Sequence, residues 1–265
     1  MVCPLAVVLA VALAATSAPV AQTRRPTNHA RVSLLAHQPH RGGLTLGVRF
    51  ELEDGWRIYW RNPGGAGSPP EFRWTLAPAF TVGSVRWPLP SRLVTNGVVG
   101  YGYERDVLLP FSAQRTRPQT GATIAVAVDY VICRDVCVKE SASASLYLPA
   151  GGATRLAEDD AARFARAASR LPESAPLSWK PSALASDDEI VLHLTARGLQ
   201  GTIEFLPFVN GLIDDGAPQR RVDANGRVSL FLRKAPGYVH PPSTLDGLVV
   251  VADTRSFLVR APLSR

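Results

Sequence analysis

One stretch of this chain alternates so regularly that only a β-strand accommodates it. Every second residue from Ile124 to Ile132 is apolar or aromatic, and Leu146 and Leu148 resume the pattern. Successive side chains of a strand point to opposite faces of its sheet, so a period of two places one row of side chains in a core. The same period recurs at positions 44–50, and strand-like runs continue over residues 31–149 without a long helical pattern. This spacing predicts a β-sandwich.

Prolines are expected to interrupt these runs. Val107, Leu108 and Leu109 form a short apolar run that we expect to end at Pro110. Proline has no backbone N–H to contribute to a hydrogen-bonded ladder, so a strand in the middle of a sheet should not continue through it.

The pattern changes after residue 150. Residues Thr154 to Leu171 carry acidic side chains in the first turns, arginines in the last turns and a modest apolar stripe, which predicts one helix. A proline-rich linker follows, and residues 187–262 alternate again. We therefore expect an all-β protein of two sandwich domains joined by one helix. The expected divisions are a first sandwich with the cysteine pair, a helix and linker, and a second sandwich, at residues 22–150, 151–181 and 182–265.

Residues 1–21 have the character of a secretory signal peptide. Leu5 to Ala15 is an uncharged apolar run, shorter than the roughly 20 residues that a membrane span needs, and small residues follow it. It departs from the usual pattern in having no lysine or arginine before the run. No later segment is long and apolar enough to be a transmembrane segment. Cleavage would remove Cys3 and leave Cys133 and Cys137 in an oxidising compartment.

The net charge of +7 does not indicate a nucleic-acid partner. All but three of the 29 basic residues are arginines, and they are scattered between the strand-like runs. A nucleic-acid binder gathers its positive charge into one face or stripe, because its affinity comes from phosphates neutralised together. No ordered Ser/His/Asp set or pair of carboxylates supports a hydrolase, and no motif calls for a cofactor.

Cys133 and Cys137 are the residues most able to carry chemistry. In a straight strand their Cα atoms would be about 13 Å apart, whereas a disulfide tolerates at most about 6.8 Å. A bond between them therefore requires a tight turn at residues 134–136. The spacing leaves three interpretations open: a redox-active pair, an inert local bond and a metal site. The small loop favours exchange, because closing about five residues stabilises a fold by only ~2 kcal/mol.

The charges beside the pair do not decide between these interpretations. Arg134 and Lys139 favour a thiolate, while Asp135 and Glu140 oppose it. The sequence also does not indicate which cysteine attacks.

The segment from Tyr130 to Glu140 resembles the cysteine motif of the N-terminal periplasmic region of DsbD-type thiol:disulfide interchange proteins, in particular the ScsB-like variant associated with copper tolerance. Residues 55–67 with Pro69 and Pro70, and residues 100–110, resemble the same family, and residues 205–211 do so more faintly. The resemblance implies immunoglobulin-like sandwiches in the periplasm. It also implies that Cys133 and Cys137 are catalytic and relay electrons from a membrane reductase to periplasmic thiol partners.

The chain departs from that family in lacking its membrane and thioredoxin-like domains, so the reductase would be encoded separately. Whether the protein is itself a protein-disulfide reductase component is left open by the residues. The alternative is a non-enzymatic binding or adaptor module with a structural disulfide, such as a copper handler. In that case His29, His37 and His40 could join the cysteines around copper(I), which favours soft thiolates.

Two further groups receive interpretations. The Gly64–Gly67 loop lacks the residues of a phosphate loop and, by the resemblance, could lie over the cysteines and shield them. Trp56, Tyr59 and Trp60 are interpreted as core and rim aromatics rather than as a sugar platform.

Export is directly testable. The intact mass of the protein recovered from the periplasm should show the loss of roughly 15 to 25 N-terminal residues, Cys3 included, because a signal peptidase cuts after the small residues. A full-length cytoplasmic product would contradict this and would leave the cysteines in a reducing compartment.

Overall fold

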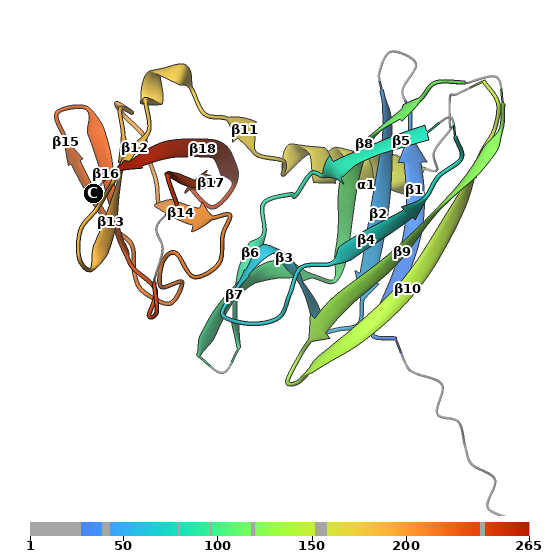
Figure 1. Cartoon of the computed structure of the whole chain (residues 1–265), viewed down its shortest axis with the longest axis horizontal. Coiled ribbons are helices and arrows are strands. Elements are labelled where there is room, and N and C mark those ends of the chain that lie inside the picture. The colour runs from blue at the N-terminus through green and yellow to red at the C-terminus, as the bar shows by residue number, and fades with distance from the viewer. Residues whose placement is uncertain are drawn as a thin grey trace, which may run out of the picture.

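The computed structural model describes residues 28–38, 43–78, 80–95, 97–117, 120–151, 158–238 and 242–264. The expected signal peptide and Thr154 lie outside these residues. The described chain is built of β-strands with one α-helix and one 3₁₀ helix, which confirms the all-β class (Figure 1).

Two sheets make up the first half of the chain. One has the strand order β1-β2-β8-β5, and the other has the order β10-β9-β3-β7-β6 with β4 also paired to β9. The strands are β1 (Ala30–His37), β2 (Leu44–Leu52), β3 (Arg57–Gly64), β4 (Glu71–Thr75), β5 (Phe80–Val85), β6 (Ser91–Thr95), β7 (Val98–Glu104), β8 (Asp106–Arg115), β9 (Ala122–Cys133) and β10 (Cys137–Leu148).

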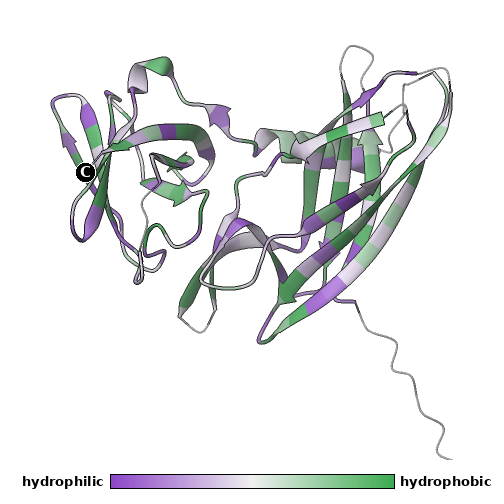
Figure 2. Cartoon of the chain, viewed as in Figure 1, coloured by the Kyte–Doolittle hydropathy of each residue, from purple (hydrophilic) through white to green (hydrophobic). Residues whose placement is uncertain are grey.

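The two sheets pack face to face around one core. Along β2 and β9 the alternating apolar residues are the buried ones, and this banding is visible along the strands in Figure 2. Phe50 of β2 meets Tyr130 of β9 edge to face, with ring centroids 5.4 Å apart. Phe111 of β8 meets Phe72 and Trp74 of β4 at 5.0 and 5.1 Å. These aromatic pairs join the two layers of an immunoglobulin-like sandwich.

The expectation that a strand ends at Pro110 is wrong. β8 runs through Pro110, which lies opposite Gly47 of β2. The carbonyl of Pro110 accepts a hydrogen bond from the N–H of Arg86, just past the end of β5. In an antiparallel sheet a residue directs its N and its C=O to the same neighbouring strand, so the missing N–H of Pro110 faces the side of β5. Val85 opposite Phe111 is the last pair of β5 with β8, so the proline stands at the margin of that pairing.

The predicted helix is present as α1 (Glu158–Ser169), two residues shorter at its C-terminal end than expected. Phe164 and Ala167 are buried against Leu108 of β8, so the helix covers one side of the first sandwich. The expected linker contains two short elements, β11 (Glu173–Ser174) and η1 (Leu177–Trp179). No helix in the described part of the chain is both long and apolar enough to span a membrane.

The second half is one continuous sheet of order β14-β17-β18-β12-β13-β16-β15, with β11 beside β18. A parallel pairing of β12 with β18 joins its two antiparallel parts, and these enclose a second core. The strands are β12 (Ser182–Ala185), β13 (Glu189–Leu194), β14 (Ile203–Pro207), β15 (Arg220–Ala224), β16 (Arg227–Arg233), β17 (Thr244–Val251) and β18 (Arg255–Ser264).

The two halves meet through a buried contact. Leu206, Leu248 and Val250 of the second half pack into the core of the first sandwich. The amide of Asn62 in β3, itself 1% exposed, donates to the carbonyl of Pro207 at 2.8 Å and accepts the N–H of Gly64 at 3.0 Å. The domain boundaries near residues 150 and 182 stay a prediction, because this contact makes part of the core common to both halves.

Replacing Asn62 with alanine should lower the free energy of unfolding by about 2 kcal/mol, because the Pro207 carbonyl and the Gly64 N–H would lose a buried partner. Urea denaturation measures this change. Gln114→Ala, at an exposed position of β8, is the control and should stay within about 0.5 kcal/mol of the parent. Equal stability of the two variants would show that the contact between the halves does not contribute.

Candidate redox site

The cysteine pair lies at the tip of the hairpin formed by β9 and β10. The antiparallel register places Cys133 directly opposite Cys137, and three residues connect them. The N–H of Arg134 donates to the carbonyl of Val136 at 3.1 Å and closes the turn. The Cα atoms of the cysteines are 4.1 Å apart and a disulfide joins the side chains. The tight turn required by the spacing is therefore present.

The two cysteines differ sharply in exposure. Cys133 is 2% exposed, whereas Cys137 belongs to the exposed residues of the hairpin. Val136 and Val138, on either side of Cys137, are also exposed. A partner approaching the hairpin tip meets Cys137 first, on a surface with apolar side chains.

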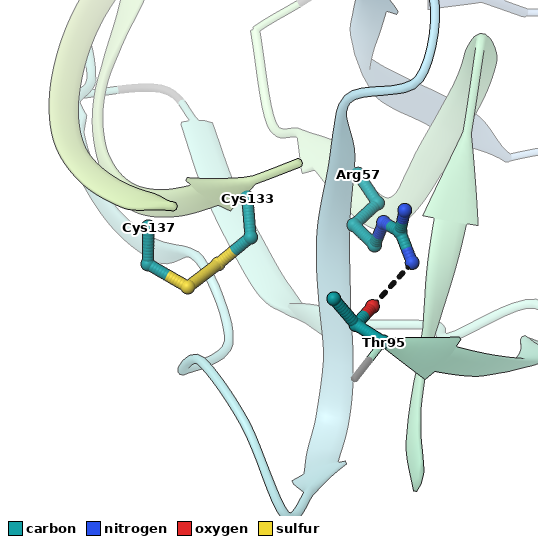
Figure 3. Close-up of a disulfide and its surroundings, with 4 residues drawn as sticks. All are labelled: Arg57, Thr95, Cys133 and Cys137. Carbon is teal, nitrogen blue, oxygen red and sulfur yellow. Dashed lines mark hydrogen bonds between the residues drawn. A yellow bond between two sulfur atoms is a disulfide. The ribbon is translucent and has the colours of Figure 1, made fainter. Parts of the chain in front are cut away.

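The neighbour of Cys133 in the sheet is Arg57 of β3, which is its direct partner in the register. Figure 3 shows that the Arg57 side chain turns away from the disulfide and toward Thr95. Its Nη1 donates to Thr95 Oγ1 at 2.6 Å. The guanidinium therefore ties β3 to the end of β6 beside the site, and it does not face the sulfur atoms.

The turn before β3 braces the hairpin loop. The Trp56 ring stacks on the ring of His29 with centroids 3.7 Å apart, and the guanidinium carbon of Arg134 lies 5.2 Å from the centre of the Trp56 ring. His29 Nδ1 lies 2.8 Å from a carboxylate oxygen of Glu53. Gly55 has a φ of +78°, and a side chain there would meet Cδ of Arg134 at 3.1 Å. Glycine at this position thus permits both the turn and the close approach of the loop.

Glu140, whose charge could oppose a thiolate, connects two parts of the first sandwich by hydrogen bonds. Its carboxylate accepts the backbone N–H of His29 at 2.9 Å and the hydroxyl of Tyr130 at 2.9 Å. Burial raises the pKa of Tyr130, and the hydrogen bond to the Glu140 carboxylate raises it further, so the phenol keeps its proton and donates. These bonds join the start of β1 to the β9–β10 hairpin.

The other predicted residues lie as follows. The three aromatic residues Trp56, Tyr59 and Trp60 are buried, which confirms their interpretation as core aromatics.

The Gly64–Gly67 loop lies against Tyr59 and Val99. A side chain added at Gly67 would strike the Tyr59 ring, and one added at Gly64 would strike the backbone of Val99. That this loop shields the cysteines stays a prediction.

The three histidines are not brought together at the cysteines. His29 is engaged with Trp56 and Glu53, and His37 packs near Phe164 with ring centroids 5.3 Å apart. His40 lies outside the described residues. Within the part of the chain that the structure describes, no group of three or more His, Cys, Asp or Glu side chains could hold a metal ion.

A second hairpin tip beside the site was missed by sequence reasoning. Val94 and Val98, next to Thr95 at the tip joining β6 and β7, are exposed. This tip and the cysteine hairpin project from the same end of the first sandwich (Figure 1). The sequence signal was the presence of Val94 and Val98 close to the Asn-Gly dipeptide of an expected turn, where polar side chains are the rule. Apolar groups gathered at one end of a domain are typical of a surface that contacts another protein.

Comparison with known proteins places this geometry in a family. Residues 26–149 match the family model described as thiol:disulfide interchange protein DsbD, N-terminal. No individually curated protein matches the chain in sequence. The crystal structure of the N-terminal periplasmic domain of ScsB from Proteus mirabilis matches with a TM-score of 0.64 and 21% identity, over 90% of this chain and 94% of that chain.

The crystal structure of the reduced N-terminal domain of DsbD from Neisseria meningitidis is also matched, with a TM-score of 0.29 and 16% identity, over 49% of this chain and 92% of that one. The ScsB match extends the shared fold over both halves of the chain. The family model assigns residues 26–149 to the DsbD N-terminal family, and this chain therefore carries a thiol:disulfide interchange module of that type.

Proposed function

We propose that the protein works in the periplasm and passes electrons from a membrane reductase to periplasmic thiol partners through Cys133 and Cys137. The observation that carries this proposal is the unequal exposure of the pair: one sulfur-bearing residue is open at a hairpin tip, and the other is buried behind it. An exchange reaction needs one accessible sulfur for the partner and one protected sulfur to complete the cycle.

In the reducing half of the cycle, a thiolate of the donor attacks Sγ of Cys137. The Cys133–Cys137 bond breaks, Cys133 leaves as a thiolate, and a mixed disulfide joins the donor to Cys137. A second donor thiolate then attacks the donor sulfur of that mixed disulfide and releases Cys137. The donor is oxidised to a disulfide, and the two cysteines take up two electrons and two protons.

In the second half of the cycle, the Cys137 thiolate attacks a disulfide of the recipient and forms a mixed disulfide, while the other recipient sulfur leaves as a thiolate. Cys133, 4.1 Å away between Cα atoms in the oxidised hairpin, then attacks Sγ of Cys137. The recipient departs fully reduced and the original disulfide is restored. The register of β9 and β10 supplies the proximity that makes this last step intramolecular.

The surroundings of Cys137 suit brief encounters with protein partners. Val136 and Val138 flank it, and Val94 and Val98 lie at the adjacent hairpin tip. These side chains offer a small apolar contact area, and small interfaces are typical of transient redox encounters.

Single serine substitutions should separate the roles of the two cysteines. Cys133→Ser should accumulate mixed disulfides, because the exposed Cys137 can still attack while the step that releases the partner is missing. Cys137→Ser should give few adducts, because only the buried thiol remains. Each variant is expressed in the periplasm, its thiols are trapped with acid, and heavier species removed by a reductant are counted on gels.

The two variants control for each other, since both lose the same disulfide and with it about 2 kcal/mol of stability. If neither traps a partner and both merely lose stability, the bond is structural and the relay is excluded. If Cys137→Ser traps more than Cys133→Ser, the assignment of the attacking cysteine is reversed.

The reduction potential gives an independent test. We expect a value above about −300 mV, because structural disulfides of secreted proteins lie below that value. Equilibration with glutathione or dithiothreitol buffers, followed by alkylation and mass measurement, determines it. A lower potential would favour the adaptor alternative, and stoichiometric copper(I) binding by the reduced protein would favour copper handling.

A further inference from the structure

A cavity of about 250 Å³ lies between the two halves of the chain, away from the cysteines. Residues from β3 and from the segment after β5 form one wall, and residues of the second half form the other. Its apolar lining includes Trp60, Trp87, Phe208 and Leu248. Ligand sites are commonly found at such junctions, with apolar walls and a few polar groups that set orientation.

Two arginines line this cavity without an opposing carboxylate. Neither Arg61 nor Arg86 forms an ion pair with the described residues. The guanidinium carbon of Arg61 lies 4.1 Å from the centre of the Phe208 ring. Arg61 is exposed as a whole residue, but its guanidinium is partly buried, and this burial lowers its pKa. The negative charge of Asp246 raises the pKa of Arg61 by a smaller amount. Asp246 already binds Arg260 at 3.0 Å.

One residue of the lining also has an unused hydrogen-bond donor. Trp60 is completely buried, and its indole Nε1 has no acceptor among the described residues. A buried indole N–H usually has a partner, so an acceptor on a bound ligand would satisfy this one.

A second apolar cavity adjoins the first and gives the ligand room to extend. It has a volume of about 280 Å³, shares Arg86 and Leu171 with the first cavity, and runs along α1 past Phe164 and Ala168. Each cavity alone is smaller than the roughly 300–1,000 Å³ of a site for a drug-sized ligand. A slender chain fits this shape better than a broad ring system.

From the two arginines of the lining, the unpartnered indole N–H and the apolar walls, we propose that the junction between the two halves binds a medium-chain aliphatic carboxylate. The carboxylate lies between Arg61 and Arg86, where charge-assisted hydrogen bonds hold it. The aliphatic chain packs on the walls formed by Trp60, Phe208 and Leu248.

The test titrates octanoate and octanol separately into the oxidised full chain and measures their binding by isothermal titration calorimetry. Octanoate should bind the parent protein at least about tenfold more tightly than octanol, since only octanoate has the charge. In the double variant Arg61→Gln/Arg86→Gln this preference should disappear, while binding of octanol stays the same. Arg31→Gln, an exposed arginine of β1 outside the cavity, is the control and should behave as the parent does.

Leu258→Trp provides a second variant that retains both charges. Leu258 lines the cavity and is 43% exposed, so a larger side chain can be accommodated while it fills the space. Both octanoate and octanol should then lose their binding. The proposal is overturned if octanoate does not bind the parent, if octanol binds the parent equally well, if the double variant keeps the preference for octanoate, or if Leu258→Trp leaves binding of both unchanged.

Discussion

The register of the β9–β10 hairpin is the constraint on which the redox site depends. The pairing runs without a break from Ala122 opposite Leu148 to Cys133 opposite Cys137. A slip of one residue would turn the row that ends at Ile132 out of the core and would separate the two cysteines. The burial that stabilises the sandwich and the proximity of the two sulfur atoms thus require the same register. Because the core maintains this register, the cysteines stay close when the bond is reduced.

In the proposed exchange, access distinguishes the two sulfur atoms, and several charged side chains near the hairpin tip have other contacts. The Arg57 guanidinium bonds to Thr95, and Glu140 holds the start of β1 against the hairpin. Arg134 lies over Trp56 and pairs with Asp135 at the exposed turn. These charged side chains shape and support the hairpin tip. What distinguishes the two sulfur positions is that β3 lies beside Cys133 in the sheet.

Strand β3 also connects the redox hairpin to the second half of the chain. Its first residue, Arg57, is the neighbour of Cys133, and its later residues Trp60 and Asn62 contact Phe208 and the Pro207 carbonyl. The second half is therefore held by the strand that covers the buried cysteine. A ligand in the junction would contact this strand as well, at Trp60, so occupancy of the junction and the order of β3 are physically coupled.

Most strands and the helix could be predicted from the sequence, because alternation, turn residues and the distribution of charge along a helix are properties of neighbouring residues. The expectation that a strand ends at Pro110 was wrong because it depends on residues that are not neighbours in the sequence. Whether the missing N–H of the proline interrupts the strand depends on where β5 stops, and β5 is distant in the sequence. The exposed valines of the β6–β7 tip likewise become a feature of the site only once that hairpin projects beside the cysteines.

The sequence by itself determined that a bond between Cys133 and Cys137 requires a tight turn at residues 134–136, since four positions of spacing along a straight strand would keep the two residues too far apart. Only the tertiary structure decided which of the two a partner can reach. Exposure depends on what lies alongside, and the strand next to Cys133 comes from a distant part of the chain through the pairing of β3 with β9. Cys137, on the outer strand of the sheet, has no such neighbour among the described strands.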